Sequence, residues 1–360
     1  METLASLLHL SPAVLWMLAK VLIVFGGVMA IAPPYTWVER RGSAMLQDRI
    51  GPNRAALFGK FRLIGLPQVV ADALKFFFKE DLVPPHANKG LFWLSPLLAF
   101  VPAMMGFAVI PFGRSFESHG VTYHLSLLDP GNGMGMLYPL AIGAVAVYGI
   151  LVAAWASNNK WSILAGMRSS AQMVSYEIGL SLAVLAVFMT TGGYDPHQII
   201  TAQTGTTFFG ILPTWNAFSQ PLGFFVFFTC MFAESNRLPF DFAECESELV
   251  SGFHTEFGSM KFGLMGLAEY VHMITASALI VTLYFGGWQV PFVKDPAVLL
   301  TVACFIAKLF FFMWVFVWIR WTLPRFRYDQ LMFAGWKVML PLSMVNLLWH
   351  AWRMTASAAH

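Results

Sequence analysis

The sequence contains little charge and little cysteine. Asp, Glu, Lys and Arg make up 11% of its 360 residues, whereas about 25% is usual for a soluble domain. The three cysteines, Cys230, Cys245 and Cys304, form no CxxC pair and are not matched to nearby histidines, so neither an Fe–S cluster nor a zinc site is expected. The sequence also lacks glycine-rich nucleotide loops and a basic stripe for nucleic acid. It therefore predicts a chain with no flavin, Fe–S cluster or metal of its own, and no nucleic-acid partner.

Long apolar runs are abundant instead. Hydrophobic residues make up 58% of the chain, with 34 Phe and 13 Trp. A run of about 20 apolar residues is long enough to cross a bilayer as a helix. We expect an all-α fold, a single membrane domain over 1–360 with eight transmembrane helices embedded in the lipid bilayer. The predicted spans are 13–37, 91–112, 134–156, 170–190, 221–238, 262–285, 298–319 and 336–353.

The basic residues are distributed unequally between the connections. Most of the 22 Lys and Arg residues lie in the odd-numbered connections, and the first of these, 38–90, holds the largest share. The opposite side holds only Arg114, Lys294 and Arg353. Because basic loops remain in the cytoplasm, we expect the odd-numbered connections there. Both termini are then expected on the opposite, periplasmic side.

The first connection, 38–90, is predicted to be a cytoplasmic amphipathic loop. Apolar residues recur at helical spacing from Leu66 to Phe78, with Asp72 on the other face. Such a helix lies in the interface plane of a membrane, either as a plain anchor or as the wall of a cavity. The arginines of 39–54 could bind anionic lipid, or they could form a folded ion-pair network with the acidic residues among them.

The region 234–261 is predicted to be an acidic cytoplasmic loop. A helix over 241–248 would place Asp241, Glu244 and Glu248 on one face. Neighbouring carboxylates raise one another's pKa values, especially when partly buried, which suits groups that exchange protons near neutral pH. A solvated acidic loop and a site for a hard cation remain alternatives.

Ionisable residues also occur inside the predicted spans. Glu177 lies in the fourth span, Glu269 in the sixth and Lys308 in the seventh. Charged groups at membrane depth are costly and usually face a protein interior or a water-filled path. We expect the two carboxylates to serve a proton path with Lys308 as a charge partner. The alternative is that all three merely lock helices together.

Five motifs together resemble a known family. They are ERRGSAMLQDRIGPNR, VVADALKFFFKED, GMRSSAQMVSYEIGLSL, FAESNRLPFDFAECESELVSGFHTEF and LPRFRYDQLM. They occur in the order found in the membrane subunit designated H of bacterial NADH–quinone oxidoreductase (respiratory complex I), whose mitochondrial counterpart is NADH dehydrogenase subunit one. The resemblance covers about residues 14 to 353, although the connections 113–133 and 192–219 match nothing in that pattern.

The resemblance implies a multi-pass subunit of the bacterial inner membrane, located where the membrane arm meets the peripheral arm. Its partners would be the other subunits of both arms, and its bound substrate a quinone, which we expect to be ubiquinone. Redox chemistry would belong to the partners, so this chain alone would carry no catalytic residues. The residues implied for the quinone chamber are Glu39, Arg41, Arg49, Arg54, Asp72, Tyr270 and Arg325. Those implied for a proton route are Glu177, Glu234, Asp241, Glu244, Glu246, Glu248 and Glu269.

Three other functions remain open from the sequence. A stand-alone proton-coupled or sodium-coupled secondary transporter would explain the membrane carboxylates, but it has no need of the long loop 38–90, and no duplicated half is visible. The related subunit of a membrane-bound hydrogenase-type complex would share much of the acidic pattern. A purely structural anchor would leave the intramembrane acids unexplained.

Overall fold

The computed structural model describes residues 12–56, 62–118, 121–128, 135–207, 212–291, 293 and 296–358. Helices dominate these residues, which confirms the predicted all-α class. The strands in this part of the chain form two short antiparallel pairs: β1 (Phe116–Ser118) with β2 (Val121–Tyr123), and β3 (Thr206–Thr207) with β4 (Leu212–Pro213).

Seven helical stretches in the described residues are long and apolar enough to cross a membrane. They are α2 (Pro12–Leu46), α4 (Lys89–Met105) with η2 (Gly106–Ala108), α5 (Leu137–Ala156), α6 (Lys160–Thr191), α11 (Ser259–Tyr284), α12 (Val298–Thr322), and a continuous run of α13 (Tyr328–Phe333), the π-helical η4 (Ala334–Met339) and α14 (Leu340–Ala358). The shorter helices are η1 (Leu63–Gly65), α3 (Pro67–Phe78), α7 (Pro196–Ala202), α8 (Asn216–Ser219), α9 (Pro221–Glu234), α10 (Glu246–Leu249) and η3 (Gly252–His254).

The expected fifth span is the element that differs most from its prediction. The sequence suggested a span over 221–238, but α9 has 14 residues and ends at Glu234. At about 1.5 Å per residue, α9 is roughly 21 Å long, less than the hydrocarbon thickness of about 30 Å. The chain turns after Ser235, where four polar or charged residues (234–237) follow the apolar run.

Other helices are longer than their apolar cores. α2 continues to Leu46, and α6 already begins at Lys160. Asn159 caps the start of α6, where its side chain accepts a hydrogen bond from the backbone of Trp161. Charged residues end the membrane-compatible run but not the helix, because Lys, Arg and Glu are good helix formers.

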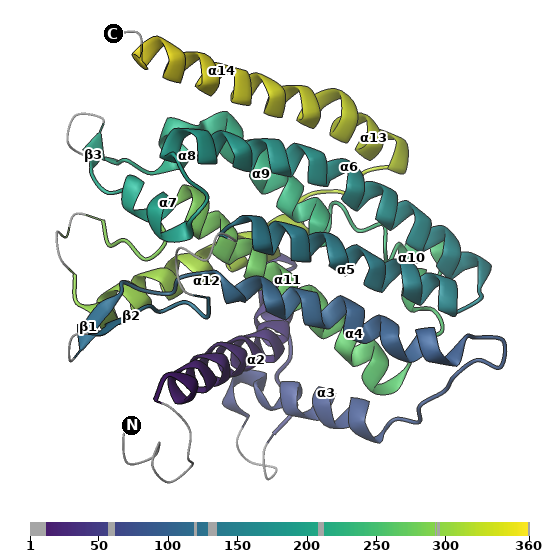
Figure 1. The fold of residues 1–360 in the computed structure, drawn as a ribbon. Coiled ribbons are helices and arrows are strands. Elements are labelled where there is room, and N and C mark those ends of the chain that lie inside the picture. Colours follow the sequence, from purple (N-terminus) through teal and green to yellow (C-terminus); the bar gives the residue numbers. More distant parts are fainter. Residues whose placement is uncertain are drawn as a thin grey trace.

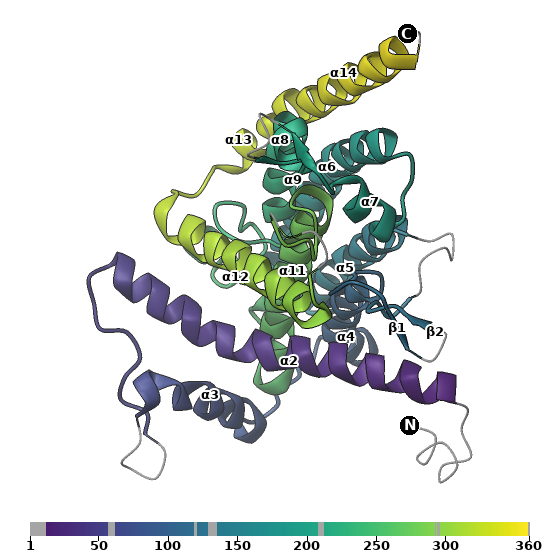
Figure 2. The ribbon, with the colours of Figure 1, turned by 90° about the vertical axis from the view of Figure 1, so that its left-hand side faces the viewer.

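Helix α11 occupies the centre of the bundle. Almost all of its residues from Val271 to Tyr284 are buried, and it packs against α4, α12 and α2. Helix α6 packs against α5, α9 and α14. Figure 2 shows α2 and α3 together on the side of the molecule away from α14. In Figure 1, α2 begins and α14 ends on the left, the side that carries β1 to β3, whereas α10 lies at the right.

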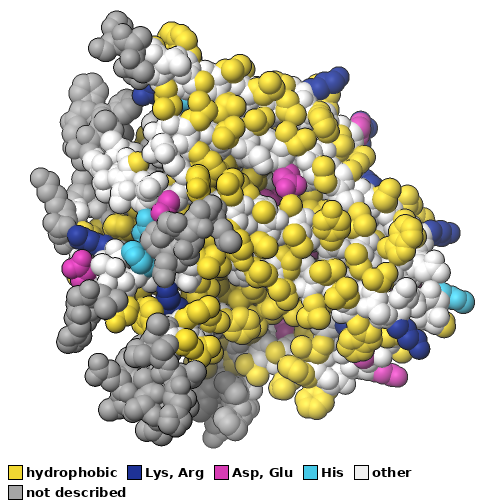
Figure 3. Space-filling view, viewed as in Figure 1, with side chains coloured by type: hydrophobic (Ala, Val, Ile, Leu, Met, Phe, Trp, Pro, Cys, Tyr) yellow, Lys and Arg dark blue, Asp and Glu magenta, His cyan; other side chains and the backbone are white. Residues whose placement is uncertain are grey.

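The outer surface is apolar between two charged margins. On α2, Leu22 and Ile23 are 71% and 68% exposed, and Trp155 on α5 is 71% exposed. Figure 3 shows hydrophobic side chains across the middle of one face and Lys and Arg towards its left and right edges. An apolar surface of this extent is what a bilayer covers.

Helix α3 lies in the first connection, where the sequence predicts a short amphipathic helix. Its apolar residues Val70, Leu74 and Phe77 are exposed. The opposite face is held to the bundle, because Phe76 packs against Gly263 and the Ser259 hydroxyl donates to the carbonyl of Phe76. The apolar stripe of α3 therefore faces away from this chain.

Candidate functional site

A buried carboxylate joins four segments of the chain. Glu39 on α2 accepts hydrogen bonds from Arg237 Nη1, 3.0 and 2.9 Å from its two oxygens, and from the Tyr270 hydroxyl at 2.6 Å. Arg320 on α12 donates to Glu39 Oε1 as well. The Glu39 and Arg237 side chains are 6% and 4% exposed. A buried ion pair needs such additional hydrogen bonds to offset its desolvation, and this network supplies them.

Arg237 is also held by an aromatic ring. Its guanidinium lies 4.4 Å from the ring centroid of Tyr270, which is cation–π distance. Burial acts against the charge of Arg237, but the nearby Glu39 carboxylate outweighs it and raises the pKa of Arg237, so the guanidinium stays charged. Arg237 follows α9 directly, and the network thereby ties the end of that short helix to α2 and α11.

Asp72, a predicted chamber residue, connects α3 to α2. It accepts from Arg40 Nη1 at 2.6 Å and from Gln68 Nε2 at 2.9 Å. Trp37 donates its indole N–H to the carbonyl of Ile64 just before α3. These contacts hold α3 beside the cytoplasmic extension of α2.

The other three arginines predicted from this region make local contacts. Arg41 donates to the carbonyl of Ile50, and Arg49 donates to the hydroxyl of Ser43 at 3.0 Å. Arg54 is exposed. They surround a turn in which Gly51 has a φ of +73°, a conformation that glycine adopts readily. The structure thus places Arg41 and Arg49 in this turn, separate from the Glu39 network.

The predicted helix over 241–248 is wrong. Residues 241–245 form turns, and α10 begins only at Glu246. The Asp241 side chain accepts from the backbone N–H of Glu244 at 3.2 Å, and Arg325 donates to the Asp241 carbonyl. These side-chain bonds replace helical ones. Asp241, Glu244 and Glu248 therefore do not share a helix face.

The acids of this segment have different surroundings. Burial and the neighbouring Glu244 carboxylate raise the pKa of Asp241 to about 6, although Arg325 opposes the rise. Glu248 is 44% exposed and lies 2.8 Å from Arg168, whose hydrogen bond lowers the pKa of Glu248. The backbone of Glu246 begins α10, and its side chain lies outside the described residues. Of the acids described in this segment, Asp241 is the one whose raised pKa suits proton exchange near neutral pH.

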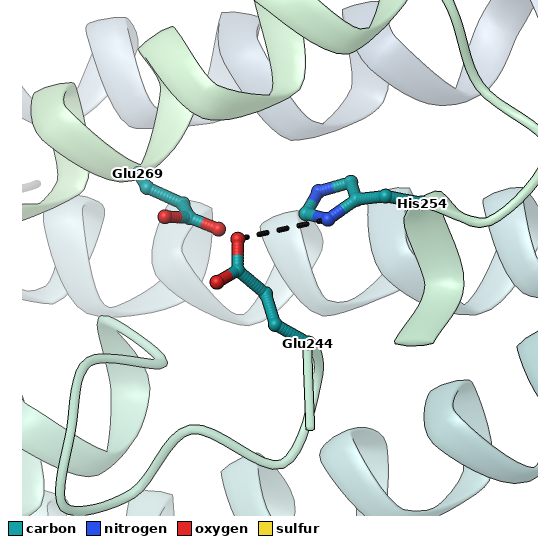
Figure 4. A group of neighbouring side chains, drawn as sticks. All are labelled: Glu244, His254 and Glu269. Atoms are coloured by element: carbon teal, nitrogen blue, oxygen red, sulfur yellow. Dashed lines mark ion pairs between the residues drawn. The ribbon is translucent and has the colours of Figure 1, made fainter. Parts of the chain in front are cut away.

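Glu244 and Glu269 come together beside a histidine. Each contributes a carboxylate oxygen, His254 contributes a ring nitrogen, and these atoms all lie within 4.8 Å of one another (Figure 4). His254 Nδ1 is 3.6 Å from Glu244 Oε1. Burial lowers the pKa of His254 to about 3, so the ring is neutral at pH 7 and the contact is not an ion pair.

Small cavities connect Glu269 to Glu234. One cavity of about 30 Å³ is lined by Glu234, Glu269 and His272, and a second of about 30 Å³ is lined by Glu234 and His272 but not by Glu269. Each has room for about one or two waters. Glu177 on α6 lies within electrostatic range of Glu234. The Glu234 carboxylate points at α5, where a Cβ added to Gly143 would come within 2.6 Å of Glu234 Oε1.

Lys308 lies apart from these carboxylates. Its Nζ donates to the carbonyls of Phe285, Gly287 and Gln289 at 2.8 to 3.0 Å. The same Nζ is 4.6 Å from the ring centroid of Trp215. Lys308 therefore satisfies the backbone at the end of α11, as the helix-locking alternative describes.

Four residues of the site had no role in the sequence-based prediction. Arg237 and Arg320 were counted only as topology signals, yet they bind Glu39. His254 and His272 were among scattered histidines, yet both lie beside predicted acids. The signals were Arg237 within the acidic motif and His272 three residues after Glu269, on the same helix face.

The fold and this network define an α-helical membrane protein with a chain of buried ionisable groups across its core. Residues 18–351 match the family model described as NADH dehydrogenase, and the chain belongs to that family. It is similar to proteins that are named as the component of NADH-quinone oxidoreductase designated H. The relative from Cytophaga hutchinsonii is 44% identical over 92% of this chain and 96% of its own length. Those from Geobacter sulfurreducens and Leptospira biflexa are both 45% identical, over 92% and 89% of this chain and 93% and 90% of their own lengths.

Proposed function

We propose that this chain is the membrane subunit of a proton-translocating NADH–quinone oxidoreductase of the bacterial inner membrane. It helps to form the quinone chamber and couples quinone reduction to proton movement. The names of its relatives support this assignment. The chain works only within the complex, because its sequence offers no motif for flavin or Fe–S clusters and the redox cofactors belong to partner subunits.

The quinone side of the site is proposed to lie between α2, α3 and α11. Its residues are Glu39, Arg41, Arg49, Arg54, Asp72, Tyr270 and Arg325. The Glu39–Tyr270 hydrogen bond marks the inner end of this region, and the exposed apolar stripe of α3 marks the outer end. A polar, charged end for the headgroup and an apolar end for the isoprenoid tail suit a quinone, and we propose ubiquinone.

The proton route is proposed to begin at Glu269, next to Tyr270. It continues through the water-sized cavity to Glu234 and then to Glu177, with Asp241, Glu244, Glu246 and Glu248 at its cytoplasmic mouth. A change of charge at the reduced headgroup would alter the Glu39–Arg237 network and thereby the protonation of Glu269. Because Lys308 binds carbonyl oxygens, we assign it no part in this route.

We further propose eight spans, with α9 as a short span shielded by its neighbours. α9 packs against α6, α14 and α11, and backbone that lies inside a bundle need not reach across the full bilayer. The loops with α3 and α10 then lie in the cytoplasm, and both termini lie in the periplasm, as the basic residues indicate.

The observation that carries the quinone assignment is the buried Glu39 network beside α3. Photo-crosslinking of native membranes with an azido-quinone tests it. We expect label in peptides from residues 39–79 or around Tyr270, displaced by excess quinone. Label confined to other subunits would overturn this part of the proposal.

The coupling role is tested by Glu234→Gln and Glu246→Gln in the assembled complex, with Glu80→Gln at an exposed position as control. We expect both test variants, but not the control, to lower the number of protons pumped per NADH or the rate of quinone reduction. Unchanged pumping and unchanged reduction in both test variants would refute the route.

Two alternatives remain useful controls. A subunit of a membrane-bound hydrogenase-type complex would share the acidic network, but the relatives named above are quinone-linked. A stand-alone transporter would be stable without partners, whereas we expect this chain to be stable only when co-expressed with the other subunits.

A further inference from the structure

Three side chains from separate segments meet where none of them is fully satisfied. Glu244 lies in the turn before α10, His254 ends η3 and Glu269 lies on α11. Their nearest oxygen and nitrogen atoms fall within 4.8 Å of one another. Among the residues that the structure describes, this is the one group of His, Cys and carboxylate ligand atoms with metal-binding geometry.

The histidine supplies an independent indication of a ligand. His254 is 4% exposed, and its Nε2 has no hydrogen-bond partner in the described part of the chain. Figure 4 shows the ring edge with both nitrogens facing the two carboxylates. An unpaired buried polar atom costs about 1–3 kcal/mol, and a bound cation facing this edge would remove that cost.

The ligand types select a class of metal. One imidazole and two carboxylates suit Zn²⁺ and similar transition-metal ions, whereas Mg²⁺ and Ca²⁺ prefer oxygen ligands alone. Bond lengths of about 2.0–2.2 Å put tetrahedral ligands roughly 3.4 Å apart. The 3.6 Å between His254 Nδ1 and Glu244 Oε1 is already close to this, and Glu269 can adjust through its flexible side chain.

The surrounding charges permit a divalent cation. Arg237 and Arg320 lie near Glu269 and oppose a positive ion, whereas Asp241 adds a further negative charge. The two ligand carboxylates balance the two charges of the metal. Three protein ligands also leave the fourth position to water, as in open zinc sites.

We propose that Glu244, His254 and Glu269 form a binding site for a divalent transition-metal ion of the zinc class. An ion there would tie up two carboxylates of the proposed proton route, so zinc should also inhibit quinone reduction. That second consequence rests on the proposed function, whereas binding itself does not.

The test compares the assembled complex with His254→Asn, and with His86→Asn as a control at an exposed histidine. Each preparation is washed free of loosely held metal and equilibrated with buffered Zn²⁺, and the bound zinc is counted by mass spectrometry. We expect the wild type and His86→Asn to bind one more zinc per complex than His254→Asn. We also expect the zinc concentration for half-inhibition to rise about tenfold or more in His254→Asn.

His254→Gln provides a second variant should His254→Asn fail to assemble. Equal zinc content in the wild type and in the assembled His254 variants, at every free concentration, overturns the site. NADH–quinone activity without zinc should be unchanged in His254→Asn and His86→Asn. Zinc content is measured without any turnover, so the metal site can fail while the proposed function stands, and the reverse.

Discussion

The hydroxyl of Tyr270 donates a 2.6 Å hydrogen bond to Glu39, a residue 231 positions earlier in the chain. The same carboxylate binds Arg237, and the guanidinium of Arg237 lies over the Tyr270 ring. One carboxylate and one ring thus hold a buried cation between α2 and α11. Any charge change beside Glu39 would be felt at Glu269, the residue next to Tyr270.

Replacing Glu39 with Gln should destabilise the assembled complex severely. The change leaves the buried Arg237 and the partly buried Arg320 without a counter-charge, which costs about 3–5 kcal/mol for a buried pair. The melting temperature and the yield of intact complex on native gels measure the effect. Arg40→Gln is the control, because the Arg40–Asp72 pair is 52% and 26% exposed and such pairs contribute about 0–1 kcal/mol. Equal melting temperatures for the two variants would contradict the prediction.

Replacing Gly143 with Ala should displace the Glu234 carboxylate. The new Cβ would lie 2.6 Å from Glu234 Oε1, and a shift of about 1 Å at a reacting group can cost tenfold or more in rate. We expect a fall of about tenfold in coupled proton pumping by proteoliposomes. Gly266→Ala is the matched helical control, since nothing lies within 4 Å of its added Cβ. A normal pumping rate in Gly143→Ala would separate Glu234 from the route.

Replacing Asp241 with Asn should alter the pH dependence of stability. The folded-state pKa of Asp241 is raised from 3.8 to about 6. Its contribution to stability is therefore fully present below about pH 4 and is lost as the pH rises through 6. Between pH 5 and 7, the wild type should lose about 1 kcal/mol that Asp241→Asn keeps.

Melting temperatures of the complex at pH 5 and pH 7 measure this difference, with the exposed Asp48→Asn as control. The melting temperature of Asp241→Asn should gain on the wild type towards pH 7, and that of Asp48→Asn should not. A gain towards pH 5 would reverse the assigned sign.

Replacing Gln172 with Met should loosen the turn after α9. The buried Gln172 amide donates to the carbonyls of Ala233 and Phe240 at 2.7 and 2.8 Å. Without it, two buried acceptors lose their donor, at about 1–3 kcal/mol each. We expect a lower melting temperature of the complex, whereas the exposed Gln47→Met should leave it nearly unchanged. Identical melting curves would show that the turn does not depend on Gln172.

The candidate site was predictable where residues lie close in sequence. The motifs placed Glu39, Tyr270 and the acids of 234–261 in one functional region, because each motif carries its own residues. The partners of these residues were not predictable. Arg320 meets Glu39 across 281 positions, and no local spacing encodes such a contact. The helix expected over 241–248 failed for a similar reason, since Arg325 from a distant segment holds the Asp241 carbonyl.

The sequence by itself determined that this chain is a bundle of membrane helices with one strongly ionisable side. Long apolar runs can satisfy their backbone in lipid only as helices, so composition was sufficient for that conclusion. Tertiary structure alone decided which charges meet: Glu39 with Arg237 and Arg320, Glu244 and Glu269 with His254, and Lys308 with carbonyl oxygens. Buried charges must find partners wherever packing brings them, and packing joins helices that the sequence keeps far apart.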